Sequence, residues 1–224
     1  MTTRLTFFII IFFIILPLKA GETFTVVIDA GHGGGNKGAV HENFEEKELT
    51  LQIALKLKTL FAGRSVTAIF TRTTDIELPP KKRAEQIESL KPDLFISLHF
   101  NSQSFITTNR GFEIYYPADS LISEPAEMVK YFHRANCSFH YGSVFKELYL
   151  DSAIFKIWSL PFNMFTQKHD LLLFDETTVP GLLLEIAYLT SPEDRACIEN
   201  NEFINDIAKF IFEAVKKSSQ EKCY

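Results

Sequence analysis

The chain has 224 residues, of which 46% are hydrophobic and 23% are charged, so it is long enough to bury a sizeable core. Its formal net charge is −5. An acidic chain lacks the positive surface by which proteins bind nucleic acids and other anionic polymers, so we expect no nucleic-acid partner.

Residues 1–20 have the pattern of an export signal. Arg4 is followed by the apolar run LTFFIIIFFIIL, which spans twelve residues and ends before Pro17. A membrane-spanning helix needs about 20 apolar residues, so the run predicts a cleaved signal peptide over 1–20. An uncleaved anchor is the alternative. We therefore expect an exported protein of the periplasm or cell envelope, with one domain over 21–224.

Six apolar runs, each bounded by polar or turn-forming residues, predict the strands of one sheet. They are Thr23–Ala30, Val66–Arg72, Asp93–Phe100, Gly111–Pro117, Asp170–Phe174 and Gly181–Leu189. Two stretches between or after them, 45–61 and 203–215, predict helices, although the leucines of the first also alternate with period two. This order predicts an α/β fold: a single three-layer sandwich with a mostly parallel or mixed sheet of about six strands and helices on both faces.

The stretch 118–169 shows no recurring strand signal and is rich in aromatic residues and leucine. One or two extra packed helices are the first interpretation. The alternative is a lid or regulatory insert, in which part of Ser143–Phe165 covers the active-site cleft. In that case a protein activator would be a partner; otherwise we expect a monomer.

Three cysteines, Cys137, Cys197 and Cys223, give an odd count for an exported protein. The count allows one disulfide and one thiol, and the spacing does not specify the pair. It fits no zinc motif either.

A glycine-rich loop, VVIDAGHGGGNKGAV over Val26–Val40, follows the first predicted strand. Such loops cradle phosphate in nucleotide enzymes, but the third glycine of the dinucleotide motif is replaced by Asn36, and the Gly-Lys-Ser/Thr of the P-loop is absent. The loop also presents a histidine, His32. His99 ends another predicted strand, and the carboxyl ends of parallel strands meet at one edge of a sheet.

Two histidines at one edge predict a metal site, for which catalytic zinc needs a third protein ligand. A carboxylate could come from the start of the helix after the loop, where Glu45, Glu46 and Glu48 lie. Residue types alone do not show which of these three glutamates would be the third ligand.

Four blocks of the sequence, in order, resemble the motifs of the zinc-dependent N-acetylmuramoyl-L-alanine amidases, which are cell-wall hydrolases. The blocks are DAGHGGGNKGAV with EEKELTLQIALKL, TRTTDIELPPKKRAEQIESLKPDLFISLHFNS, GFEIYY, and VPGLLLEIAYLTSPED. The resemblance implies one Zn²⁺ per chain, peptidoglycan or its fragments as the partner, and hydrolysis of the amide between N-acetylmuramic acid and L-alanine.

The resemblance also implies a set of site residues. Its metal ligands match His32, Glu46 (in the pattern E-K-x-x-x-L) and His99. The glutamate that acts on the attacking water in that family matches Glu185, and an apolar setting would raise the pKa of this carboxyl toward working pH.

Two further positions match recurrent family residues, Asn101 and Arg83, and are candidates for substrate binding. Arg72 also matches, and it or Arg83 could instead pair with Asp75 or Glu85. The family often has Asp where this chain has Asn36.

Three other functions stay open on the sequence. One is a zinc exopeptidase or carboxypeptidase acting on wall peptides. Another is an added serine-based activity, because Ser143 and Lys146 form the pattern S-x-x-K of penicillin-binding enzymes, although the companion motifs are absent. The third is a non-catalytic wall-binding regulator.

Overall fold

A computed structural model describes residues 23–103, 109–117, 125–166 and 171–223. The predicted signal peptide, 1–20, lies outside these ranges. Within them, none of the helices is both long enough and apolar enough to cross a membrane.

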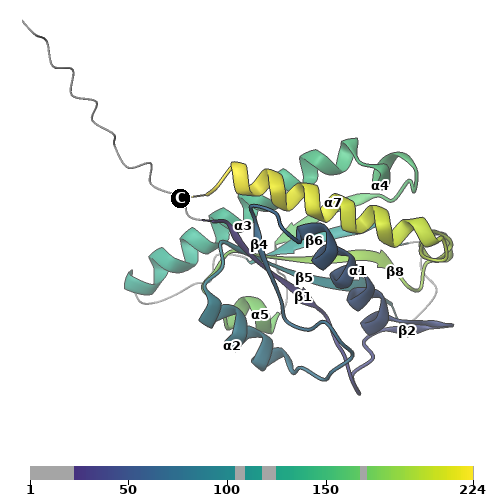
Figure 1. Cartoon of the computed structure of the whole chain (residues 1–224), viewed down its shortest axis with the longest axis horizontal. Helices are drawn as coiled ribbons and strands as arrows, with labels where there is room; N and C mark the ends of the chain where they lie inside the picture. Colours follow the sequence, from purple (N-terminus) through teal and green to yellow (C-terminus); the bar gives the residue numbers. More distant parts are fainter. Residues whose placement is uncertain (1–22, 104–108, 118–124, 167–170, 224) are drawn as a thin grey trace, which may run out of the picture.

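A mixed sheet of six strands, in the order β4-β1-β5-β8-β6-β7, forms the centre of the molecule (Figure 1). Its first four strands are parallel, β6 is antiparallel to β8, and β7 is parallel to β6. The strands are β1 (Thr25–Ala30), β4 (Thr67–Phe70), β5 (Leu94–Asn101), β6 (Phe112–Tyr116), β7 (Phe162–Thr166) and β8 (Gly181–Tyr188). The expected α/β sandwich with a mixed sheet is confirmed.

Helices cover both faces of this sheet. One face carries the four helices α1 (Glu46–Phe61), α3 (Pro125–Asp151), α4 (Ala153–Lys156) and α7 (Asn201–Gln220). The other face carries two shorter helices, α2 (Pro80–Leu90) and α5 (Leu172–Asp175). A small hairpin, β2 (Val40–His41) with β3 (Phe44–Glu45), precedes α1, and α6 (Pro192–Ile198) precedes α7.

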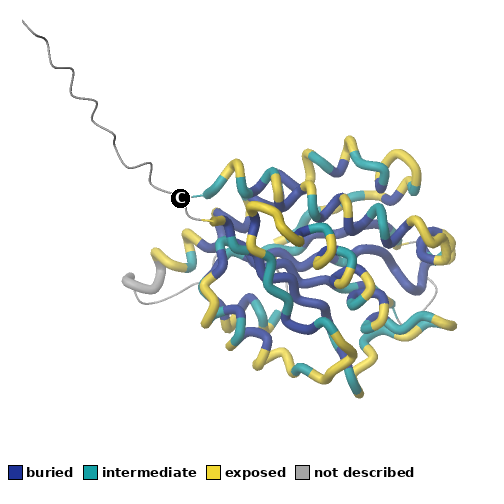
Figure 2. The backbone as a smooth tube through the Cα atoms, in the orientation of Figure 1, coloured by how far each residue is buried: buried dark blue, intermediate teal, exposed yellow. Residues whose placement is uncertain are grey.

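Side chains of the central strands alternate between the two faces of the sheet, so that apolar core residues lie on one face and the polar site residues lie on the other. In β5, Ile96 and Leu98 are fully buried in the larger core under α1, α3 and α7 (Figure 2). Because successive side chains of a strand point to opposite faces, Ser97 and His99 lie on the face covered by α2 and α5. The smaller core on that face leaves room for polar groups near the strand ends.

The leucine-rich stretch 46–61 is a helix, as expected. Leu49, Ile53 and Leu57 lie on one helical face and are at most 5% exposed, whereas Leu55 is 41% exposed. The period-two alternation therefore has no structural role here, because a helix of this length buries its 3.6-residue stripe against the sheet and α7.

One predicted strand was wrong. Asp170–Phe174 does not form a strand: the described part of this run contains α5, a short helix over Leu172–Asp175. The sixth strand is instead β7, Phe162–Thr166, inside a stretch where no strand was expected. Leucine favours helix over strand, whereas the aromatic-rich sequence FNMFT suits an edge strand.

The excursion over 118–169 belongs to the fold as far as it is described. Phe145, Tyr149, Ile154 and Leu160 are fully buried in the larger core. Within Ser143–Phe165 no residue lines the active-site cavity described below. The described part of the segment packs as helices and a strand of the sandwich, and the lid or regulatory insert stays a prediction. We therefore expect deletion of the segment to unfold the protein.

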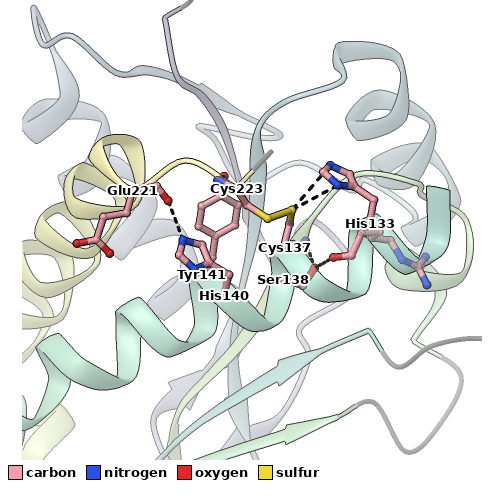
Figure 3. The surroundings of a disulfide bond; sticks show 9 residues. His133, Cys137, Ser138, His140, Tyr141, Glu221 and Cys223 are labelled. Carbon is pink, nitrogen blue, oxygen red and sulfur yellow. Dashed lines mark hydrogen bonds between the residues drawn. A yellow bond between two sulfur atoms is a disulfide. The ribbon is translucent and has the colours of Figure 1, made fainter. Parts of the chain in front are cut away.

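A disulfide joins Cys137 of α3 to Cys223 near the end of the chain, 86 residues apart (Figure 3). Cys197 is a buried free thiol. Two hydrogen bonds hold the same tail: Nε2 of His140 lies 2.7 Å from the carbonyl oxygen of Glu221, and the backbone N–H of Cys223 donates to the Tyr141 hydroxyl. The tail is thus fixed to α3 both covalently and by polar contacts.

Reduction of this disulfide is expected to lower the free energy of unfolding by about 2–4 kcal/mol, because the unfolded chain regains the entropy of a long open loop. Urea unfolding with and without reductant measures the change. The variant Cys137→Ala/Cys223→Ala is the matched control, and reductant should not shift its midpoint. Equal midpoints for the wild-type protein in both conditions would contradict the prediction.

Candidate metal centre

The glycine-rich loop brings the backbone unusually close to the candidate ligands. A Cβ atom on Gly31 would lie 2.6 Å from Cε1 of His99, and one on Gly38 would lie 2.5 Å from Oε2 of Glu46. Gly38 also has φ = +68°, a conformation that residues with a Cβ rarely adopt. Because Gly31 and Gly38 lack a Cβ, the side chains of His99 and Glu46 can lie directly against the loop backbone, as expected of a metal-binding loop.

Two buried arginines hold the backbone of this loop. Arg72 donates from Nε to the carbonyl of Ala30 at 2.9 Å and from Nη2 to that of Gly31 at 2.8 Å. Arg83 donates to the carbonyls of Ala30 and His32. Three successive carbonyls are thus bound by guanidinium groups, which fixes the position from which the His32 side chain projects.

Asp29, the acidic residue at the end of the opening strand, balances this positive charge. It is fully buried, forms an ion pair with Arg83 at 2.6 Å, and accepts from the hydroxyls of Thr71 and Ser97. Burial alone would raise the pKa of Asp29, but the Arg83 charge and these hydrogen bonds outweigh it and lower the pKa. Arg83 therefore pairs with Asp29, and neither Asp75 nor Glu85 is its partner: these carboxylates bind Lys47 and Lys82.

The three predicted metal ligands come together. His32 follows β1, Glu46 is the first residue of α1, and His99 lies near the end of β5, and one ligand atom from each lies within 4.8 Å of the others. Nε2 of His32 is 3.1 Å from Oε2 of Glu46, and Nδ1 of His99 is 2.8 Å from Oε1. In the described part of the chain, no other group of His, Cys, Asp and Glu has this geometry.

Glu45 and Glu48, the other two carboxylates at this helix start, are not part of the cluster. Oε1 of Glu45 is 2.5 Å from the Lys37 ammonium, and Glu48 is exposed. Lysines flank Glu45, whereas Glu46 points between the two histidines and also accepts from the backbone N–H groups of Ala39 and Phe100.

The charges of the cluster are mutually stabilising. Burial would raise the pKa of Glu46, but the hydrogen bonds and charges of the two histidines outweigh it and hold the pKa far below its usual range. Burial likewise would lower the pKa of His99, but the Glu46 carboxylate raises it. Glu46 thus stays ionised, which is the form that binds a metal.

Asn36, the departure from the family pattern, orients His32. Its Oδ1 accepts from the N–H of Gly38 at 3.1 Å, so this atom is an acceptor. Nδ1 of His32 lies 2.9 Å from the same oxygen and must therefore carry the proton. When Nε2 gives up its own proton, this tautomer offers the Nε2 lone pair to a metal ion, as is typical of metal-binding histidines.

Glu185 lies on β8 directly opposite His99 of β5. Its Oε2 is buried and has no hydrogen-bond partner within the described structure. Burial, together with the charges of Glu46 and Glu113, raises the pKa of Glu185 to about 7, although His99 acts in the opposite direction. A carboxyl group with this pKa can both accept and donate a proton near neutral pH.

The cluster and Glu185 line one cavity of about 450 Å³. One wall is apolar and comes from Leu78, Pro80 and Leu171–Leu173. Asn101 lies on the polar side, whereas Arg83 directs its donors into the protein, at Asp29 and at the carbonyls of the loop and of Leu78. Sequence reasoning missed the leucine wall, because this apolar run was interpreted as a strand.

The serine motif has no comparable setting. The Ser143 hydroxyl donates to the carbonyl of Phe139 one turn earlier in α3, and Lys146 is exposed on the same helix. Neither residue lines the cavity. These contacts are those of an ordinary helix and give no support to a serine nucleophile.

Comparisons with known proteins agree with this site. The family described as N-acetylmuramoyl-L-alanine amidase matches residues 26–217, which include all four candidate site residues. The chain belongs to this amidase family. The match covers the whole α/β sandwich, from β1 into α7.

Several curated proteins are similar to this chain. The endolysin of Bacillus phage SPP1 is 28% identical over 186 residues, which are 82% of this chain and 62% of the endolysin. A germination-specific N-acetylmuramoyl-L-alanine amidase of Bacillus subtilis is 22% identical over 211 residues, covering 88% of this chain and 80% of that protein. The chain thus spans less than two thirds of the endolysin.

A solved structure shows the same fold. The catalytic domain of CwlV, an N-acetylmuramoyl-L-alanine amidase from Bacillus (Paenibacillus) polymyxa, superposes with a TM-score of 0.72 at 26% identity. The likeness covers 88% of this chain and 98% of that domain.

The substitution Gly38→Ala is expected to weaken metal binding at least tenfold, because its Cβ would collide with Oε2 of Glu46 and with the His32 ring. Competition between the protein and a chelator of known affinity for an added divalent metal measures this. Gly63→Ala is the matched control: Gly63 has φ = +69°, but a Cβ there meets nothing within 4 Å. Equal losses of metal affinity in both variants would show that backbone strain, not the collision, is responsible.

The substitution Glu185→Gln is expected to stabilise the metal-free protein at pH 8 by about 1–3 kcal/mol. The folded pKa of about 7 exceeds the ordinary glutamate pKa of 4.5, so ionising this carboxyl opposes folding. The gain should be absent below pH 4.5, grow between pH 4.5 and 7, and stay constant above it. Urea unfolding of both proteins across this range measures it, and a gain independent of pH would contradict the prediction.

Proposed function

We propose that this chain is a zinc-dependent amidase that hydrolyses the bond between the lactyl group of N-acetylmuramic acid and L-alanine in peptidoglycan. One observation carries the proposal: His32, Glu46 and His99 form a metal-binding cluster, and Glu185 lies beside it in the same cavity. Membership of the amidase family supports the choice of substrate.

The donor set suits zinc. Two neutral imidazoles and one carboxylate are a common protein ligand set for catalytic Zn²⁺ and leave a coordination position open. A bound Zn²⁺ supplies Lewis acidity, which activates water and polarises the amide carbonyl. His32, Glu46 and His99 would hold the ion, with Asn36 fixing the tautomer of His32.

Glu185 is the residue proposed to move the proton. Its buried Oε2 accepts a proton from the attacking water and passes it to the amide nitrogen as the C–N bond breaks, so the products are a free lactyl carboxyl group and a free α-amino group. The raised pKa makes both halves of this transfer feasible near pH 7. Loss of this group typically costs about 10²–10⁴-fold in rate.

A feature remote from the metal cluster also fits export. A disulfide between Cys137 and Cys223 is expected in an oxidising compartment and rare in the cytosol. We propose that a signal peptide over 1–20 directs the chain to the cell envelope, where peptidoglycan is its partner and the chain acts as a monomer.

The test is mass spectrometry of purified wall fragments after digestion. We expect stem peptides that begin with a free L-alanine and glycan strands with free lactyl groups. EDTA should abolish the reaction and Zn²⁺ should restore it. Glu185→Ala should keep its zinc and lose at least 100-fold in rate.

Other products would refute particular parts of the proposal. Release of single amino acids from peptide ends would indicate an exopeptidase. Full activity after verified metal removal would exclude the metal mechanism, and full activity of Glu185→Ala would exclude the role of that carboxylate. The variant Glu147→Gln, which changes an exposed carboxylate on α3, is the control and should match the wild type.

A further inference from the structure

A second buried carboxylate, Glu113 of β6, lies directly opposite Glu185 in the antiparallel pair of β6 and β8. It is 6% exposed. Like charges directly opposite each other destabilise a sheet. A conflict of this kind at a buried position is typical of functional sites, so the contacts of Glu113 need an explanation.

Three donors satisfy Glu113. The hydroxyl groups of Tyr115 and Tyr188 each donate at 2.9 Å, and Nδ2 of Asn101 donates at 3.2 Å. Burial, and then these bonds to Glu113, raise the pKa of both tyrosines, so both stay protonated as donors. Glu113 therefore accepts hydrogen bonds from three donors. Among these three donors, Asn101 is the residue that lines the cavity.

These contacts fix the orientation of the Asn101 amide. The carboxylate of Glu113 can only accept, so it selects the NH₂ group, and the backbone N–H of Ser102 donates to Oδ1 at 2.8 Å, which selects the oxygen. The NH₂ group has a second N–H, for which the described residues provide no acceptor. Asn101 is half-buried and lines the cavity together with His99 and Glu185.

We propose that Glu113 is a positioning residue that holds the Asn101 amide so that its second N–H donates to an uncharged oxygen of the substrate, such as an amide carbonyl. The inference rests on the proposed amidase function and adds a binding contact to it. An anionic group is disfavoured at this place, because the carboxylates of Glu113 and Glu185 lie opposite each other beside it.

The test compares KM and kcat on a soluble muramoyl-peptide. Glu113→Leu removes both acceptor oxygens, so this position can no longer accept from Asn101. We expect KM to rise about tenfold and kcat to stay within about twofold, because a hydrogen bond made equally in ground and transition states affects binding only. Asn101→Asp, which removes the donor at constant shape, should raise KM at least as much.

The double variant decides whether Glu113 acts through Asn101. Adding Glu113→Leu to Asn101→Ala should raise KM no further, because the group that Glu113 positions is already absent. Zinc content should equal that of the wild type throughout, and Glu147→Gln should behave as the wild type does. Additive effects on KM, or a fall in kcat at constant KM, would overturn the inference while leaving the proposed function intact.

Two further outcomes distinguish a folding defect, or a failure of the proposed function, from a failure of the positioning role of Glu113. If Glu113→Leu does not fold, Asn101→Asp alone decides, and an unchanged KM in that variant overturns the inference. If the wild-type protein releases no product from the muramoyl-peptide, the proposed function fails, and the inference fails with it.

Discussion

The binding of two buried guanidinium groups to three successive carbonyls is the interaction on which the rest of the site depends. Arg72 and Arg83 hold the backbone at Ala30, Gly31 and His32. A loop rich in glycine has high conformational entropy, so without such contacts it would not keep a ligand in one place. Buried arginines in turn need a buried anion. Asp29 provides it, which explains an acidic residue at the end of an otherwise apolar strand.

The sequence predicted the residues at strand ends well, because period-two patterning and the parallel arrangement bring such positions to one edge. His32 and His99 could be found on these grounds alone. The third ligand could not, since Glu45, Glu46 and Glu48 are equally acidic, and only the family pattern singled out Glu46. The structure shows the physical reason: Lys37 binds Glu45, and Glu46 lies on the helix face that meets the histidines.

Features that depend on contacts distant in sequence were not predictable. The short leucine run of the cavity wall carries no reliable period, and its helix is held by packing of Phe174 against Phe95 and by Arg134, which donates to the carbonyls of Phe174 and Thr177. The hydrogen bonds of Glu113 join β6 to β5 and to β8, and Tyr188 of β8 is 75 residues away from Glu113 in the sequence. The disulfide could not be inferred from three cysteines, because its two halves meet only after α3 and the C-terminal tail pack together.

The disulfide has a geometric consequence for the whole chain. Cys223 lies near the amino end of β1, because the ammonium group of its neighbour Lys222 is 5.6 Å from the ring of Phe24. Both ends of the sandwich therefore meet at one corner, whereas the metal cluster lies at the carboxyl ends of the strands, about 20 Å along β1. Any further domain joined to either end would start from the edge opposite the cleft.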